Sequence, residues 1–241
     1  MSAETIALLK HISTATLTTQ LFKRGLRNAF LQGVRPLGIY AARMVGPART
    51  LRNIPAREDL DHSGVFANPD HPQRRAIDTM PAGHVLVIDC RRDTNAASAG
   101  DILATRLMVR GAAGLVSDGG IRDSAIIARM ALPVFCAGPS APLNIARHHA
   151  VDIDLPIACG GVAVYPGDII VGDADGVVVI PAHLADAVAR DAAAQEALEV
   201  FLQQRVAAGH GLPGTYPPNA ETLAAYEASK HAISSPKTGD H

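Results

Sequence analysis

The chain has 241 residues, of which 48% are hydrophobic and 19% are charged, and its formal net charge is −1. This length and apolar content suit one large domain with a sizeable core and exclude a globally disordered chain. The near-neutral charge lacks the concentrated positive charge that a nucleic acid or an anionic membrane requires, so we expect neither as a partner.

The N-terminal region is expected to be helical over residues 2–32, because its apolar residues recur at helical spacing. Its first residues lack the basic and apolar blocks of a signal peptide, and no segment reaches the ~18 uncharged apolar residues of a membrane span. We therefore expect a cytoplasmic protein. Strands are predicted at Ile39–Val45 and Ala48–Leu51, around a turn at Gly46-Pro47.

Residues 53–81 are charged and rich in turn-forming residues, and we expect a surface excursion with a short helix at Gln73–Thr79. From residue 83 onward, buried strands alternate with helices, which is typical of parallel α/β packing. The expected elements are the strand Val85–Asp89, the helix Gly100–Arg110, the strand Gly114–Ser117, the helix Ser124–Met130 and the strand Pro133–Cys136.

The C-terminal half has short strands separated by closely spaced turns, a pattern that predicts antiparallel β ribbons. These strands are expected at Val151–Ile157, Val162–Val164, Asp168–Val171 and Gly176–Ile180, and a long helix follows at residues 182–208. The chain is thus predicted to form a single α/β domain over residues 1–211, with an N-terminal helical arm at 1–35. Residues 212–241 are expected to form an extended tail, with a helical turn at Ala220–Ser229.

Gly100 and Asp101 precede a predicted helix and form the first of two motifs that could carry chemistry. Gly100 lets the backbone approach a ligand closely. If Asp101 begins the helix, the amides of Ile102 and Leu103 point towards any bound anion.

Arg122 and Asp123 form the second motif, after a glycine-rich turn. The strand Gly114–Ser117 is expected to return the chain to the sheet edge where Asp101 lies. Arg122 offers a planar fork for a carboxylate, and Asp123 offers a hard oxygen ligand for Mg²⁺ or Mn²⁺, which leaves Asp101 to orient a metal-bound water. A plain helix cap and a surface ion pair would give the same spacing, so spacing alone leaves both interpretations open.

The segment from Gly100 to Asp123 strongly resembles the class II 4-hydroxy-4-methyl-2-oxoglutarate aldolases and the related RraA-like proteins, inhibitors of ribonuclease E. The shared pattern is Asp, twenty residues, then Arg-Asp, and residues 152–168 and 172–181 are similar to the family as well. The resemblance spans roughly residues 12–210. It implies a swivelling β/β/α-type fold with mixed sheets, a homotrimer or homohexamer, and an active site between subunits.

The resemblance also implies a role for each motif residue. The aspartate that matches Asp123 binds the divalent metal, and the arginine that matches Arg122 holds the substrate and stabilises an enolate. The aspartate that matches Asp101 holds metal-bound water. The backbone amides that match Ile102 and Leu103 hold the substrate carboxylate.

In this family a glutamate from the C-terminal helix of a neighbouring subunit completes the site. Glu199 is the best match because it precedes the segment Arg205–Gly209 as in the family, and Glu196 is the alternative. Either residue could instead be a solvated helix carboxylate.

The implied activity is a divalent-metal-dependent lyase that cleaves a 4-hydroxy-2-oxo acid by a retro-aldol reaction through a pyruvate enolate. Oxaloacetate decarboxylation, which passes through the same enolate, is an expected side activity. The alternatives are a non-catalytic regulator that binds a ribonuclease, and another metal-enolate reaction, such as a dehydration, on the same scaffold.

One departure from the family is the stretch from Cys90 to Asn95, which replaces a glycine-rich segment. Arg91 and Arg92 within it could contact the distal end of an acidic substrate or could be solvated surface residues. This change and the excursion at 53–81 put the usual six-carbon substrate in doubt.

Other polar candidates are weaker. The scattered cysteines at 90, 136 and 159 are expected to be buried thiols. His148 and His149, expected on a short helix, do not share a face and do not suggest a metal site. The segment Asp173–Gly176 reads as a β-turn.

Overall fold

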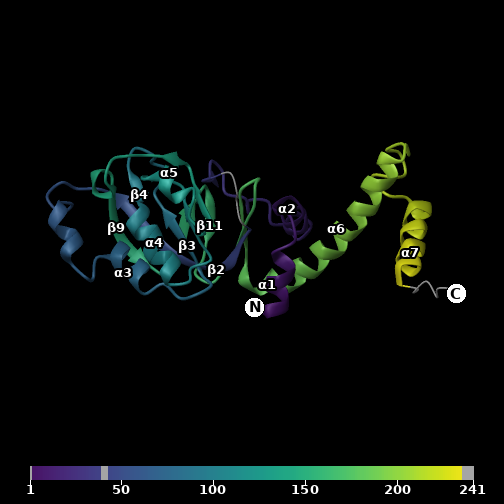
Figure 1. Ribbon diagram of the computed structural model, residues 1–241, viewed down its shortest axis with the longest axis horizontal. Helices are drawn as coiled ribbons and strands as arrows, with labels where there is room; N and C mark the ends of the chain where they lie inside the picture. The colour runs from purple at the N-terminus through teal and green to yellow at the C-terminus, as the bar shows by residue number, and fades with distance from the viewer. Residues whose placement is uncertain (1, 39–42, 235–241) are drawn as a thin grey trace. The chain divides into compact units, whose positions relative to one another are not determined.

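The computed structural model describes residues 2–38 and 43–234, apart from the side chains of 231–234 (Figure 1). The chain divides into two compact units at Arg190/Asp191. Most of the strand predicted at Ile39–Val45 therefore lies outside the described residues, as does the end of the tail. Within the described ranges, none of the helices has the length and hydropathy needed to cross a membrane.

The first unit is built on a mixed sheet that contains eight strands within the described residues. Its order is β1-β7-β5-β3-β2-β12-β13, and β9 also pairs with β2. Strands β2, β3, β5 and β7 are parallel neighbours, and the others join them antiparallel. The bounds are β1 (Arg35–Pro36), β2 (Met44–Pro55), β3 (Val85–Asp89), β5 (Gly114–Ser117), β7 (Val134–Cys136), β9 (His148–Ile153), β12 (Ile169–Gly172) and β13 (Val177–Ile180).

Strand β3 shows how the sheet separates two hydrophobic clusters. Successive side chains of a strand point to opposite faces. Leu86 and Ile88 pack in one cluster with residues of the helices α3 (Pro72–Asp78), α4 (Asp101–Val109) and α5 (Ser124–Ile127). Val85 and Val87 pack in the other with the antiparallel ribbon of β10 (Ile157–Cys159) and β11 (Val162–Val164). Both faces of the sheet are thus covered, which explains why its strands are apolar runs in the sequence.

Strand β2 runs without a break through Gly46 and Pro47, where the sequence predicted a turn. At Gly46 the chain passes so close to its neighbour that an added Cβ would lie 2.3 Å from the Gly83 carbonyl oxygen. Pro47 lies opposite Ile169 of β12, one residue before the parallel pairing with β3 begins at Ala48. Glycine thus serves close backbone approach here, and proline lies where the strand changes partner.

A second sheet of three parallel strands lies within the described part of the first unit. It consists of β4 (Ala97–Ala99), β6 (Gly120–Ile121) and β8 (Gly138–Pro139), in that order. These strands are two or three residues long and were not expected from the sequence. They matter because β4 ends directly before Gly100 and Asp101, and β6 ends directly before Arg122 and Asp123.

The N-terminal arm contains the helices α1 (Ala3–Leu9) and α2 (Thr14–Lys23), so the helical prediction for 2–32 is wrong only after Lys23 and its cap. Helix α2 ends before Gly25, which has a left-handed φ of +84°. The following segment is extended, with Phe30 bridged to Val178 of β13. Backbone pairing with the sheet replaces the predicted helix there.

Helix α6 (Ala185–Ala207) follows a 3₁₀ turn at Ala182–Leu184, close to the predicted long helix. The tail contains the helix α7 (Ala220–Ser234), which begins where a helical turn was expected and is longer than predicted. The Asn219 side chain accepts from the Thr222 amide and caps α7, and the Tyr226 ring lies 5.4 Å from that of Phe201 on α6. An aromatic contact and a cap therefore order this part of the tail.

Candidate active site

The short strands β4 and β6 bring the two polar motifs together. They are parallel, with Ala99 opposite Ile121, so their carboxyl ends coincide. The amide of Arg122 donates to the Ala99 carbonyl at 3.1 Å. The expected return of the chain to the Asp101 edge is thus made by β6, not by the predicted strand that became β5.

Gly100 allows the two motifs to touch. It is the N-cap residue of α4, and its φ of −132° is open to any residue. An added Cβ would lie 2.8 Å from Asp123 Oδ2 and 2.9 Å from Arg122 Cγ. A glycine is needed here because of close packing, not because of backbone conformation.

Asp123 holds a left-handed conformation with φ 56° at the start of α5. Non-glycine residues rarely adopt this conformation, and those that do cluster at functional sites. Its Oδ2 accepts from Arg122 Nε at 3.2 Å and lies 3.5 Å from the Asp101 amide. Its Oδ1 has no hydrogen bond within the described residues, and the side chain is 31% exposed, so this oxygen is available to a ligand.

Asp101 is the first residue of α4, and its Oδ1 accepts from the Ile102 amide at 2.7 Å. The Ile102 amide is therefore occupied by Asp101, which corrects the expectation that it points at a ligand unpaired. The first intrahelical bond runs from the Ala104 amide to the Gly100 carbonyl. The Leu103 amide, one residue earlier, keeps an N–H without an intrahelical partner.

A pocket of about 220 Å³ collects these residues. It is smaller than the roughly 300 Å³ at which sites for drug-sized ligands begin, which suits a small metabolite. All the motif residues line it, together with others that the sequence did not single out. The lining residues are Phe66, Gln73, Arg74, Ala97, Ser98, Ala99, Gly100, Asp101, Ile102, Leu103, Arg122, Asp123, Leu143 and Asn144.

Helix α3 supplies pocket residues that the sequence analysis missed. Gln73 Nε2 donates to the Ser98 carbonyl of β4 at 2.6 Å, which ties α3 to the strand that ends at Gly100. Ala76 and Ile77 of the same helix are buried in the core, so this part of the 53–81 segment is not a surface excursion. The signal for these residues in the sequence was the short helix expected at Gln73–Thr79, in which polar residues lie beside the apolar pair Ala76 and Ile77.

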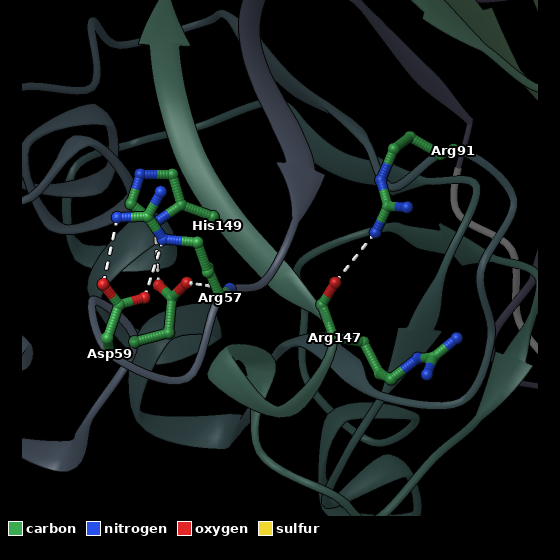
Figure 2. Close-up of polar contacts among 6 residues, drawn as sticks. Arg57, Asp59, Arg91, Arg147 and His149 are labelled. Atoms are coloured by element: carbon green, nitrogen blue, oxygen red, sulfur yellow. Dashed lines mark hydrogen bonds and ion pairs between the residues drawn. The ribbon is translucent and has the colours of Figure 1, made fainter.

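The loop that follows β2 is fastened by polar contacts. Arg57 Nε lies 2.7 Å from Asp59 Oδ1 (Figure 2). His149 Nδ1 lies 2.8 Å from Asp61 Oδ1. His149 and His148 begin strand β9, not the short helix that was expected.

Arg91 and Arg92 lie outside the residues that line the pocket. Both have left-handed φ values, 58° and 57°. Arg91 Nη2 donates to the Arg147 carbonyl at 2.8 Å (Figure 2), and the Arg92 guanidinium packs against Gly161. Their side chains thus fasten neighbouring segments within the chain, and a contact with the distal end of a substrate stays a prediction.

Asp118 is buried at the end of β5 and joins three segments of the chain. Its carboxylate accepts from the amides of Cys90 at 2.6 Å, Gly160 at 3.1 Å and Arg92 at 3.3 Å. Burial raises the pKa of this carboxyl, although the N–H donors favour its charged form. Asp118 therefore links the end of β5 to the loop after β3 and to the β10–β11 turn.

The carboxylates of the pocket fit a hard divalent cation. Mg²⁺ usually takes one or two protein carboxylates and fills the remaining positions with water. Asp123 and Asp101 line the same pocket, and within the described ranges no group of three or more His, Cys, Asp or Glu residues could hold a metal. Two carboxylates in one pocket form a donor set of the kind that Mg²⁺ or Mn²⁺ accepts.

Glu199 and Glu196 lie on α6 in the second compact unit, whereas the pocket is lined by residues of the first. Glu199 Oε1 accepts from Gln195 Nε2 at 2.8 Å, one helical turn away. The predicted part of Glu199 in the site stays a prediction.

The remaining polar candidates are structural. The cysteines are free and buried, and burial raises the pKa of Cys90 to about 12. Asp173 accepts from the amide and hydroxyl of Thr14, both at 2.8 Å, and its own amide donates to the Gly176 carbonyl. The predicted turn at Asp173–Gly176 is present.

A sequence model of RraA-like proteins, described as Aldolase/RraA, matches residues 14–179. The chain belongs to the RraA-like family. The family match includes both motifs of the pocket, and Glu199 lies beyond it.

Two curated relatives are similar to this chain over part of their length. A protein of Halalkalibacterium halodurans named "Putative 4-hydroxy-4-methyl-2-oxoglutarate aldolase" is 38% identical over 138 residues, which are 57% of this chain and 60% of that protein. Protein DlpA of Legionella pneumophila is 27% identical over 85% of this chain, which matches 32% of DlpA. The chain thus spans less than two thirds of the length of these two relatives.

Solved structures share the fold. Streptomyces coelicolor RraAS2, described as an unusual member of the RNase ES inhibitor RraA protein family, is 30% identical, with a TM-score of 0.74 over 84% of this chain and 97% of that one. An uncharacterized protein from Pseudomonas syringae is 25% identical, with a TM-score of 0.79 over 91% of this chain and 95% of that one. The mixed α/β architecture, with N-terminal helices and a long C-terminal helix, is therefore that of the RraA-like fold.

Proposed function

We propose that this protein is a divalent-metal-dependent lyase that releases pyruvate from a 4-hydroxy-2-oxo acid similar to 4-hydroxy-4-methyl-2-oxoglutarate. The observation that carries the proposal is the junction of Asp101, Arg122 and Asp123 in one small pocket. The name of the Halalkalibacterium relative supports the same reaction class.

Asp123 would hold Mg²⁺ or Mn²⁺ through the oxygen that has no partner within the described residues, with Asp101 beside it. When bound, the cation supplies positive charge at the carboxylate and keto oxygens of the substrate. This role suits a site with few protein ligands, because a 2-oxo acid needs open coordination positions.

The chain's own residues would then guide bond cleavage. The C4 hydroxyl loses its proton to a water held by Asp101, the C3–C4 bond breaks, and its electron pair forms the enolate of pyruvate. The Arg122 guanidinium would stabilise the negative charge that develops on the C2 oxygen. Return of a proton to C3 completes pyruvate. Loss of CO₂ from oxaloacetate leads to the same enolate, so that decarboxylation belongs to the proposal.

The proposal includes a homo-oligomer, a trimer or a hexamer, with the site completed by a second copy. Ile102 is 78% exposed and Leu143 is 48% exposed, although both line the pocket. Exposed apolar side chains around a functional pocket are typical of a surface that another chain covers. Glu199, or Glu196, of the neighbouring copy is the proposed further carboxylate.

The test is pyruvate release from a panel of 4-hydroxy-2-oxo acids with Mg²⁺ or Mn²⁺ in a coupled assay. We expect EDTA to abolish the release and Arg122→Ala to lower kcat/KM by about 10²–10³-fold, the usual effect of removing one stabilising donor. Asp123→Ala should lower activity at least as much. The control Arg129→Ala removes an exposed arginine just after α5 and should retain activity. Full activity in either pocket variant contradicts the assignment.

A regulator that binds a ribonuclease is the second candidate, favoured by the likeness to RraAS2. It predicts direct binding of a purified ribonuclease together with no pyruvate release from any acid of the panel. That pair of results would reverse the preference for an enzyme.

A further inference from the structure

Arg74 brings a second guanidinium to the pocket that contains Arg122. It lies on α3, with its Cζ 4.5 Å from the centre of the Phe66 ring. Among the residues that the structure describes, its side chain has neither an ion pair nor a hydrogen bond, and its Nε is buried without a partner. The nearby carboxylate of Asp78 pairs instead with Arg106, at 2.8 Å.

An unpaired cation in this position is energetically unfavourable without a ligand. Burial lowers the pKa of Arg74 from its ordinary value, which reflects the loss of water around the charge. A guanidinium nevertheless stays protonated in proteins, so the charge must find a counter-ion or remain partly unsolvated. An anion bound in the pocket would supply that counter-ion in the planar geometry that arginine prefers.

Two further polar atoms of the same pocket lack partners. Gln73 is 2% exposed and Asn144 is 7% exposed, and the structure gives no hydrogen bond to Gln73 Oε1 or to Asn144 Oδ1. The other end of the Gln73 amide is fixed by its bond to the Ser98 carbonyl. Buried polar groups in native proteins are nearly always paired, so these acceptors indicate a ligand that carries a donor such as a hydroxyl group.

The charges of the pocket indicate how many anionic groups that ligand has. Arg74 and Arg122 balance Asp101 and Asp123, so a bound divalent cation leaves an excess of two positive charges. A 2-oxo acid with one carboxylate neutralises half of this excess. A 2-oxo acid with two carboxylates neutralises all of it.

We propose that Arg74 binds the distal carboxylate of the substrate and makes the site selective for 2-oxo dicarboxylic acids over their monocarboxylic analogues. Gln73 and Asn144 line the same pocket, each with one amide oxygen that lacks a partner. This assignment rests on the proposed lyase function for the identity of the ligand. The assignment makes Arg74, a residue of the 53–81 segment, responsible for binding the distal carboxylate of the substrate, in place of Arg91 and Arg92.

The test compares the wild type with Arg74→Met, which keeps an apolar stem against Phe66 and removes the charge. Its control is Arg75→Met, which removes the neighbouring exposed arginine of α3. Binding of 2-oxoglutarate and of 2-oxobutyrate is measured by calorimetry in Mg²⁺, which requires no turnover. We expect Arg74→Met to weaken 2-oxoglutarate binding about 10- to 100-fold, the usual effect of losing a charged hydrogen-bonded pair. Binding of 2-oxobutyrate should change less than about threefold.

The same variants are then assayed for pyruvate release from 4-hydroxy-2-oxoglutarate and 4-hydroxy-2-oxopentanoate. The loss of kcat/KM should be confined to the dicarboxylate, and Arg74→Lys, which keeps the charge but not the planar fork, should restore part of it. Thermal unfolding of each variant checks that the fold persists. A wild type without preference for 2-oxoglutarate, or a preference that survives Arg74→Met, overturns the assignment. A preference that depends on Arg74 without any pyruvate release would overturn the lyase and leave the anion subsite standing.

Discussion

At the scale of single residues, Gly100 and Asp123 together define the site. Gly100 leaves room for the Asp123 carboxylate and the Arg122 side chain, and Asp123 takes a left-handed conformation to reach that place. Both motif pairs are predictable from the sequence, because their order and spacing are local properties. Arg74 is not, because it reaches the pocket only through the packing of α3 on β4.

Gly100→Ala tests this close packing. The backbone conformation of Gly100 suits alanine, but the new Cβ would lie 2.8 Å from Asp123 Oδ2 and displace it. We expect pyruvate release to fall by about 10²-fold or more, in line with a small misplacement of reacting groups. Overpacking should lower the free energy of unfolding by about 1–3 kcal/mol.

The matched control is Gly211→Ala, where an added Cβ would lie 3.7 Å from Pro213 Cδ, an ordinary van der Waals distance. For both variants, kinetics measures the effect on the site, and urea unfolding measures the effect on the stability of the whole protein. Unchanged kcat and KM in Gly100→Ala would show that the packing around Gly100 does not position Asp123.

At the scale of elements, the sequence predicts buried strands best. Strands β3, β5 and β11 have the predicted bounds, because uninterrupted apolar runs between turns leave few alternatives. Strands β4, β6 and β8 were missed, since two or three residues carry no periodicity. Those short strands align the two motifs, so the sequence predicted the site residues without the element that joins them.

Asp118→Asn tests how the loop after β3 is held. An amide at this position keeps one good acceptor and brings an NH₂ group towards amides that already donate to Asp118. We expect the free energy of unfolding to fall by about 1–3 kcal/mol, the cost of leaving buried donors unpaired. Urea unfolding measures it, with exposed Asp70→Asn as the control. Equal stability of the two variants would contradict the role given to Asp118.

At the scale of the whole molecule, two buried histidines make stability depend on pH. Burial lowers the pKa of His148, with Arg91 adding to the effect, and burial also lowers the pKa of His71. In the unfolded chain the pKa of each histidine returns to about 6.5. Below that pH the unfolded chain takes up protons that the folded protein does not, so acid favours unfolding.

The free energy of unfolding should therefore fall as the pH drops from about 7.5 to 5.5, by up to about 1.4 kcal/mol per pH unit for each histidine. His148→Gln should reduce this slope, whereas His183→Gln, at an exposed position before α6, should not. Urea unfolding at several pH values and fixed protein concentration measures it. A slope that is the same in His148→Gln and in the wild type would contradict the prediction.

The bond from Gln73 to Ser98 has a consequence for how the site is divided along the chain. The residues assigned to bond cleavage lie between Gly100 and Asp123, whereas Arg74 and Phe66 belong to an earlier segment that is joined to β4 at its Ser98 carbonyl. Because that bond uses a main-chain oxygen, it does not depend on which side chain β4 presents. On the proposed assignment, the side chain that selects the substrate and the groups that react thus lie in separate segments of the chain, joined by a main-chain contact.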